Sequence, residues 1–125
     1  EFFDCLPHGY CIIDDQYRIL SWNRSLEEWS GKLRSEMIGQ HLTDLQPKLR
    51  SLEYKNRFDL VYKSGTPFVF SPLIHGQVVP CGNGKAKQVH RTYLMKYKSN
   101  ANNTALLIVE NVTRSHESML QHREV

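Results

Sequence analysis

Four side chains in the sequence are of the types that ligate soft metal ions, but their spacing does not favour a metal site. They are Cys5, Cys11, His75 and Cys81. None of them forms the C-x-x-C or H-x-x-x-H pairs that are typical of zinc sites, so we predict no metal ion. Three cysteines are also an odd number without the spacing of a disulfide framework. This favours a reducing, cytoplasmic location.

Paired carboxylates could support general acid–base catalysis, and the sequence offers one adjacent pair. Asp14 and Asp15 follow each other directly, so on a strand their side chains would point to opposite faces. We therefore interpret them as turn residues. The sequence contains no G-x-S-x-G nucleophile motif, and we predict no catalytic residues. An enzyme would need a buried carboxylate with a raised pKa in the pocket. The acids on the predicted long helix, Glu53 and Asp59, each lie beside basic residues on its polar face.

The net charge is +3, and the basic residues are unevenly distributed. Residues 60–109 contain six Lys and Arg residues and no acidic residue, a pattern that can serve an anion or a nucleic acid. No nucleic-acid motif accompanies it, and Gly82–Lys85 is followed by Ala86 where a phosphate-binding loop needs Ser or Thr. Apolar stretches such as residues 105–109 are far shorter than the roughly 18 residues of a membrane span. We expect a solvated strand face, with an anionic ligand as the alternative, and no contact with nucleic acid or membrane.

The elements that hold these residues begin with a predicted hairpin and helix. The chain has 125 residues, 40% of them hydrophobic, which fits one globular domain. Apolar runs at residues 10–14 and 18–22 flank the polar segment Asp15–Tyr17, and this pattern predicts a β-hairpin. Asn23 is a favoured N-cap for a helix over Arg24–Ser30, and the glycine that follows is a favoured C-terminal residue.

The remaining segments complete an α+β pattern. Further helices are predicted over residues 1–6, 35–38, about 48–63 and 114–125, and strands near 68–72, 89–97 and 105–112. Polar segments at residues 81–87 and 99–103 suit hairpin loops. We predict one five-stranded antiparallel sheet with short helices on one face. The domain would cover residues 1–113, and residues 114–125 would begin a C-terminal signalling helix.

In order and in residues, these segments resemble the PAS domain family. The similar segments are residues 9–14 (GYCIID), 18–23 (RILSWN), 28–31 (EWSG), 35–42 (SEMIGQHL) and 108–114 (IVENVTR). They match the first two strands, the two short helices and the exit motif of the family. Two residues depart from the family pattern: Tyr17 stands where a glycine is frequent, and Asn111 stands where the exit motif usually has Asp.

The resemblance implies a non-catalytic sensory module of a cytoplasmic signalling protein, such as a two-component sensor kinase, a cyclase-like enzyme or a transcription regulator. Helices and the inner face of the sheet would enclose a small, as yet unidentified ligand. Candidate lining residues, chosen by apolar face and by analogy, are Ile13, Trp22, Trp29, Met37, Leu42, Phe58, Tyr62, Phe70 and Tyr93.

Two special cofactors of the family are disfavoured by the residues present. Haem is commonly held by a histidine on the long helix, and residues 48–63 contain none. A covalent flavin adduct needs a cysteine at the start of that helix, and no cysteine lies between Cys11 and Cys81. A non-covalent small molecule remains, and the aromatic rings of Trp22 and Trp29 could stack on a flavin or pack in the core.

The resemblance also implies how a signal would leave the domain. The last strand would move Asn111, Val112 and Thr113, and the C-terminal helix would pass the change to an output domain in the same chain. Asn111 cannot form the ion pair that Asp could, so hydrogen bonding would have to hold this joint. The alternative is a ligand-free dimerisation module, with Phe2, Phe3 and Leu6 of the first helix at a homodimer interface.

Overall fold

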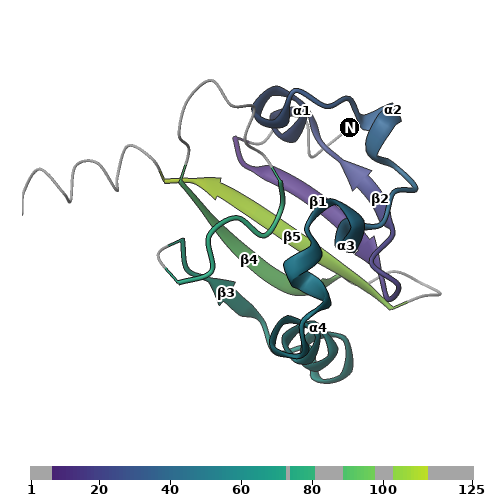
Figure 1. Ribbon diagram of the computed structural model, residues 1–125, viewed down its shortest axis with the longest axis vertical. Helices are drawn as coiled ribbons and strands as arrows, with labels where there is room; N and C mark the ends of the chain where they lie inside the picture. The colour runs from purple at the N-terminus through teal and green to yellow at the C-terminus, as the bar shows by residue number, and fades with distance from the viewer. Residues whose placement is uncertain (1–6, 73, 81–88, 98–102, 113–125) are drawn as a thin grey trace, which may run out of the picture.

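The computed structural model describes residues 7–72, 74–80, 89–97 and 103–112. Five antiparallel strands form one sheet in the order β2-β1-β5-β4-β3, and the helices gather on one face of it (Figure 1). The strands are β1 (Gly9–Asp14), β2 (Ile19–Trp22), β3 (Phe68–Phe70), β4 (His90–Tyr97) and β5 (Thr104–Asn111). The helices are α1 (Arg24–Ser30), α2 (Arg34–Met37), α3 (Leu42–Leu45), the 3-10 helix η2 (Pro47–Arg50) and α4 (Leu52–Ser64). The predicted fold class is confirmed.

Some predicted elements fall outside the described residues. These are the N-terminal helix over residues 1–6, the basic loop over 81–87, and the C-terminal helix over 114–125 with its domain boundary after residue 113. They stay predictions.

The β1–β2 hairpin is closed by the side chain of Asp14. Its Oδ1 accepts hydrogen bonds from the backbone N–H groups of Gln16 (2.9 Å) and Arg18 (2.8 Å), which is the usual way an Asp stabilises a turn. Tyr17 has a φ of 66°, a left-handed conformation that glycine adopts with little strain. The turn role predicted for Asp14 is therefore confirmed, and Tyr17 occupies the backbone conformation that a glycine would favour.

Asn23 joins the hairpin to α1. Its side-chain oxygen accepts from the backbone N–H of Leu26 (3.3 Å), the first turn of α1, and from that of Tyr10 (2.9 Å) on β1. Its amide nitrogen donates to the backbone oxygen of His8 at 2.9 Å. The helix ends at Gly31, with a φ of 74°. The predicted cap is confirmed, and the same side chain also fixes the start of β1 against α1.

The predicted long helix over residues 48–63 is divided in the structure. Residues 47–50 form the 3-10 helix η2, and α4 begins only at Leu52 because Ser51 is extended, with a ψ of 154°. Pro47 stands at the start of η2, where its missing N–H costs no intrahelical bond. Gly65, with a φ of 74°, ends α4 as predicted.

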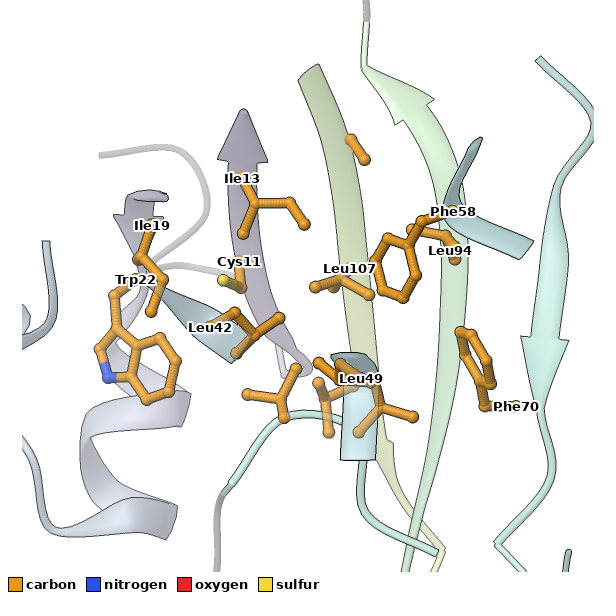
Figure 2. Close-up of a cluster of buried hydrophobic side chains, with 14 of the residues drawn as sticks. Cys11, Ile13, Ile19, Trp22, Leu42, Leu49, Phe58, Phe70, Leu94 and Leu107 are labelled. Atoms are coloured by element: carbon orange, nitrogen blue, oxygen red, sulfur yellow. The ribbon is translucent and has the colours of Figure 1, made fainter. Parts of the chain in front are cut away.

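The core lies between the helices and the sheet. Figure 2 shows side chains from β1 and β2, from α3, η2 and α4, and from β5, β4 and β3 pointing toward one another. On β5, Ala105, Leu107 and Val109 are fully buried in this cluster. Because side chains alternate along a strand, Leu106 and Ile108 point to the opposite surface. We call the sheet surface that carries the core the inner face, and the opposite surface the outer face.

Candidate functional site

The structure brings most of the predicted lining residues together in the core. Ile13, Trp22, Met37, Leu42, Phe58, Tyr62 and Phe70 belong to one buried cluster, and Trp29 is partly buried against it. Figure 2 shows five of them, Ile13, Trp22, Leu42, Phe58 and Phe70, where the helices meet the inner face. Their role in lining a ligand cavity stays a prediction.

Tyr93 is the exception, and its assignment to the pocket is wrong. It lies between Thr92 and Leu94, which are buried, while Tyr93 itself is only partly buried. Its hydroxyl donates to Glu110 Oε1 at 3.4 Å, and Arg91 pairs with the same oxygen at 3.0 Å. Tyr93 therefore belongs to the outer face. The residue type of Tyr93 does not indicate which face it occupies, because the outer face also carries apolar side chains.

One end of the core, beside the β1–β2 turn, contains two tyrosines. The hydroxyl of Tyr62 donates to the backbone oxygen of Asp14 at 2.5 Å. The ring of Tyr17 meets Phe58 edge-on, with centroids 5.1 Å apart, and its buried hydroxyl has no hydrogen-bond partner in the described segments. Burial, with a smaller effect of Asp59, raises the pKa of Tyr17 to about 12. Burial also raises the pKa of Tyr62. Both phenols therefore stay protonated at neutral pH.

The other end of the inner face carries two polar residues that sequence reasoning did not select. His90 and Thr92 of β4 are 2% and 1% exposed. His90 Nε2 and Thr92 Oγ1 are buried and have no hydrogen-bond partner among the described residues, and burial lowers the pKa of His90. The ring of Trp29 stacks on His90, with centroids 5.5 Å apart and planes at 27°. The sequence could have indicated them through the alternation of side chains along β4, which puts His90 and Thr92 on the same face of the sheet.

A segment after β3, residues 74–80, covers this region, and we call it the strap. It runs from the β3 side of the molecule across the inner face toward α1 (Figure 1). Gln46 Nε2 donates to the backbone oxygen of Gln77 (3.0 Å), and Lys48 Nζ donates to that of His75 (2.5 Å). Val78 and Val79 are buried in the core, and Gln77 Nε2 lies 3.4 Å from His90 Nδ1. The strap therefore connects η2 and its flanking turn to the polar residues of β4.

The chain leaves the sheet beside His90 and Thr92. In the β4–β5 ladder His90 lies opposite Asn111, and Thr92 lies opposite Val109. The backbone N–H of Val112 donates to the backbone oxygen of Val89 at 2.9 Å. Of the predicted relay residues, Asn111 and Val112 thus lie at this end of the sheet, whereas Thr113 is outside the described residues.

The sequence also matches a family model described as "PAS domain" over residues 7–114. This match covers most of the chain. The chain belongs to the PAS domain family. No curated protein matches it by sequence.

Solved PAS structures share this domain's fold at low sequence identity. A sensory box sensor histidine kinase from Vibrio cholerae has a TM-score of 0.64 and 19% identity, covering 90% of this chain and 87% of that chain. The PAS domain of an HTR-like protein from Haloarcula marismortui has a TM-score of 0.66 and 12% identity, with 88% and 85% covered. The PAS domain of the Cronobacter turicensis RpfR quorum-sensing receptor, in complex with BDSF, has a TM-score of 0.61 and 17% identity, with 86% and 96% covered.

The described residues can also be searched for a metal site and for a membrane-spanning helix. Over those residues, no group of three His, Cys, Asp or Glu side chains could hold a metal ion. No helix of the described segments is long and apolar enough to cross a membrane. The predictions that disfavour haem and a covalent flavin adduct are not tested by these findings.

Proposed function

We propose that this PAS domain is a non-catalytic sensory module of a cytoplasmic signalling protein. It binds a small molecule between the helices and the inner face, and it passes the resulting change to an output domain in the same chain. The observation that carries this proposal is the position of β5, which is the central strand of the sheet and ends at Asn111, one of the predicted relay residues.

The contacts of β5 give this proposal its physical basis. The strand pairs with β1 on one side and β4 on the other, and its inner residues Ala105, Leu107 and Val109 are fully buried. Protein cores are close-packed, so a ligand that changes the packing must move neighbouring side chains or backbone. A shift of β5 would reach Val112 directly. To act as a switch, the ligand must bind one packing more tightly than the other.

Native mass spectrometry of the domain purified from cells tests ligand binding. We expect an additional mass on the folded protein that is lost on denaturation. A folded protein without any added mass, from several hosts and growth conditions, would contradict a bound ligand.

Substitutions at the exit test the relay. Replacing Asn111 with Ala in the full-length protein should leave ligand affinity within about twofold and abolish most of the ligand-dependent change in output activity. Asn56→Ala, an exposed position on α4, is the matched control and should switch normally. Normal switching of Asn111→Ala combined with Thr113→Ala would refute the relay.

The outer face favours a second candidate, a ligand-free homodimerisation module. Two apolar side chains of its edge strands are solvent-exposed: Leu20 of β2 at 43% and Val69 of β3 at 47%. A second copy of the chain, with Phe2, Phe3 and Leu6, would cover this surface. Sedimentation of Leu20→Lys/Val69→Lys should then show a monomer. Leu52→Lys, on α4 and 72% exposed, should leave the dimer intact. A monomeric wild-type chain would remove this candidate.

A further inference from the structure

The geometry points to His90 and Thr92 as the polar anchor of the ligand site, and to an uncharged carbonyl compound, such as an amide or a ketone, as the ligand class. This inference rests on the proposed function, because it names where the proposed ligand binds and what it must offer. Neither His90 nor Thr92 is among the lining residues predicted from the sequence.

The pair presents two hydrogen-bonding atoms that the protein leaves unused. His90 and Thr92 are two residues apart on β4 and face the same side of the sheet, with Cα atoms about 6.6 Å apart. Nε2 of His90 and Oγ1 of Thr92 are both buried without a partner. Most buried polar side-chain atoms in proteins are paired. Two unpaired atoms side by side therefore call for an explanation, and a ligand that pairs with both would provide one.

The neighbours of His90 define which hydrogen bonds the site offers. Gln77 Nε2 lies 3.4 Å from Nδ1 and, as an amide nitrogen, can only donate. Nδ1 is then the acceptor of a neutral imidazole, and Nε2 carries the proton. Nε2 therefore offers a donor to a carbonyl oxygen, and the hydroxyl of Thr92 can donate to or accept from a second polar group of the ligand.

The walls of the site favour an uncharged ligand with an apolar body. Trp29 stacks on His90, and Val109, opposite Thr92 on β5, is fully buried. The described ring contacts of His90 are with Trp29 and Gln77, and neither is charged. A carboxylate would lose its hydration here without gaining a cation, and such burial is costly.

Ligand entry requires the covering elements to move. The unpaired atoms are enclosed by the protein, so the structure shows the site closed. The strap lies against it through Gln77, and Val78 and Val79 are packed into the core. A ligand that takes the place of these contacts would displace the strap or Trp29. The unpaired atoms disfavour the closed packing, so pairing them with a ligand favours the open one.

Thermal unfolding of the ligand-free full chain, unfolded and refolded to remove any bound molecule, tests whether the two atoms are unpaired in the closed protein. Thr92→Val has the same shape without the hydroxyl, and we expect it to raise Tm by roughly 2–5 °C. Thr104→Val is the matched control. Thr104 is also buried, but its Oγ1 donates to the backbone oxygen of Tyr97 at 2.8 Å, so this variant should lower Tm. A fall in Tm for Thr92→Val similar to that of Thr104→Val would overturn the inference.

Binding of small probes tests the ligand class. Benzamide and acetamide offer an uncharged carbonyl, and benzoate is the charged counterpart of benzamide. In NMR titrations that follow the backbone N–H signals, we expect saturable, millimolar binding of benzamide or acetamide. The largest chemical-shift changes should occur at residues 90–92 and Trp29. Benzoate should bind at least tenfold more weakly, as should the amide to Thr92→Val. Equal affinity of wild type and Thr92→Val, equal binding of benzoate, or no amide binding would each overturn the inference.

Native mass spectrometry separates failure of this inference from failure of the proposed function. If wild type and Thr92→Val retain the same cellular ligand equally, the sensory function stands and the anchor is wrong. Loss of the cellular ligand from Thr92→Val, with retention by Thr104→Val, supports the anchor.

Discussion

Within the described part of this PAS domain, three buried polar side-chain atoms have no hydrogen-bond partner. They are the hydroxyl of Tyr17, Nε2 of His90 and Oγ1 of Thr92. Each unpaired buried group costs about 1–3 kcal/mol, so each makes a specific contribution to stability that substitution can measure.

His90 predicts a loss of stability in mild acid. Burial lowers the pKa of His90 below its ordinary value of 6.5, so below that pH the unfolded chain binds a proton that the folded chain does not. The His90 contribution is therefore fully present above pH 6.5 and is lost as the pH falls from there toward the lower pKa of the folded state. Urea unfolding between about pH 5 and pH 7.5 should show this slope in wild type and in Thr92→Val, and a reduced slope in His90→Gln. An unchanged slope in His90→Gln would contradict the prediction.

Tyr17 and Tyr62 predict opposite results for the same chemical change. Tyr17→Phe removes an unpaired hydroxyl and should stabilise the fold by about 1 kcal/mol, whereas Tyr62→Phe removes the hydrogen bond to Asp14 and should destabilise it by about 1 kcal/mol. Urea unfolding at neutral pH measures both. Equal effects would show that the environments of the two hydroxyls do not differ.

Alkaline pH gives an independent measurement of Tyr17. Its pKa is raised from 10.0 to about 12, so above pH 10 the unfolded phenol loses a proton that the folded one keeps. The Tyr17 contribution to stability is therefore complete below pH 10 and is lost as the pH rises toward 12. Unfolding midpoints at about pH 8 and pH 10.5 should differ less in Tyr17→Phe than in wild type. Identical differences in the two proteins would contradict this.

Among the elements, those with strong local signals were predictable and those set by tertiary packing were not. Asp14 and Asn23 mark the turn and the helix cap through short-range hydrogen bonds, so their types and positions sufficed. The start of α4 was predicted too early, because the extended backbone of Ser51 has no distinctive residue signal. The assignment of Tyr93 failed because both faces of β4 carry apolar residues. His90 was not selected because a histidine on or beside a strand is more often a plain strand residue than a ligand.

Asn23 predicts strong coupling between β1 and α1. Asn23→Ala removes hydrogen bonds to Leu26, Tyr10 and His8, and should cost about 2–4 kcal/mol of unfolding free energy. The exposed Asn56→Ala should cost less than about 0.5 kcal/mol. Chemical denaturation compares them directly, and a similar small loss in both would show that Asn23 is only a surface cap.

In the molecule as a whole, Gly9 allows α1 to pack closely against the sheet. A Cβ at Gly9 would lie 2.4 Å from Leu26 Cδ2 and 3.2 Å from Trp29 Cζ3, so Gly9→Ala must displace the buried Leu26 side chain or the helix α1 that carries it. We expect a loss of about 1–3 kcal/mol and a changed fluorescence spectrum for Trp29. Because Trp22 also emits, the comparison should be made in Trp22→Phe with and without Gly9→Ala. An unaltered spectrum and stability would show that the helix tolerates the methyl group.

The central place of β5 has a consequence for synthesis of the chain. β1 and β4 each pair with β5, yet β5 is the last strand to leave the ribosome. Until residue 111 has emerged, the β1–β2 hairpin and the β3–β4 pair have no strand to join them, and long-range pairing of this kind slows folding. The domain therefore cannot assemble the inner face of its sheet before β5 has been synthesised. A chain interrupted before β5 would expose two incomplete half-sheets, which is the form in which β proteins are most prone to aggregate.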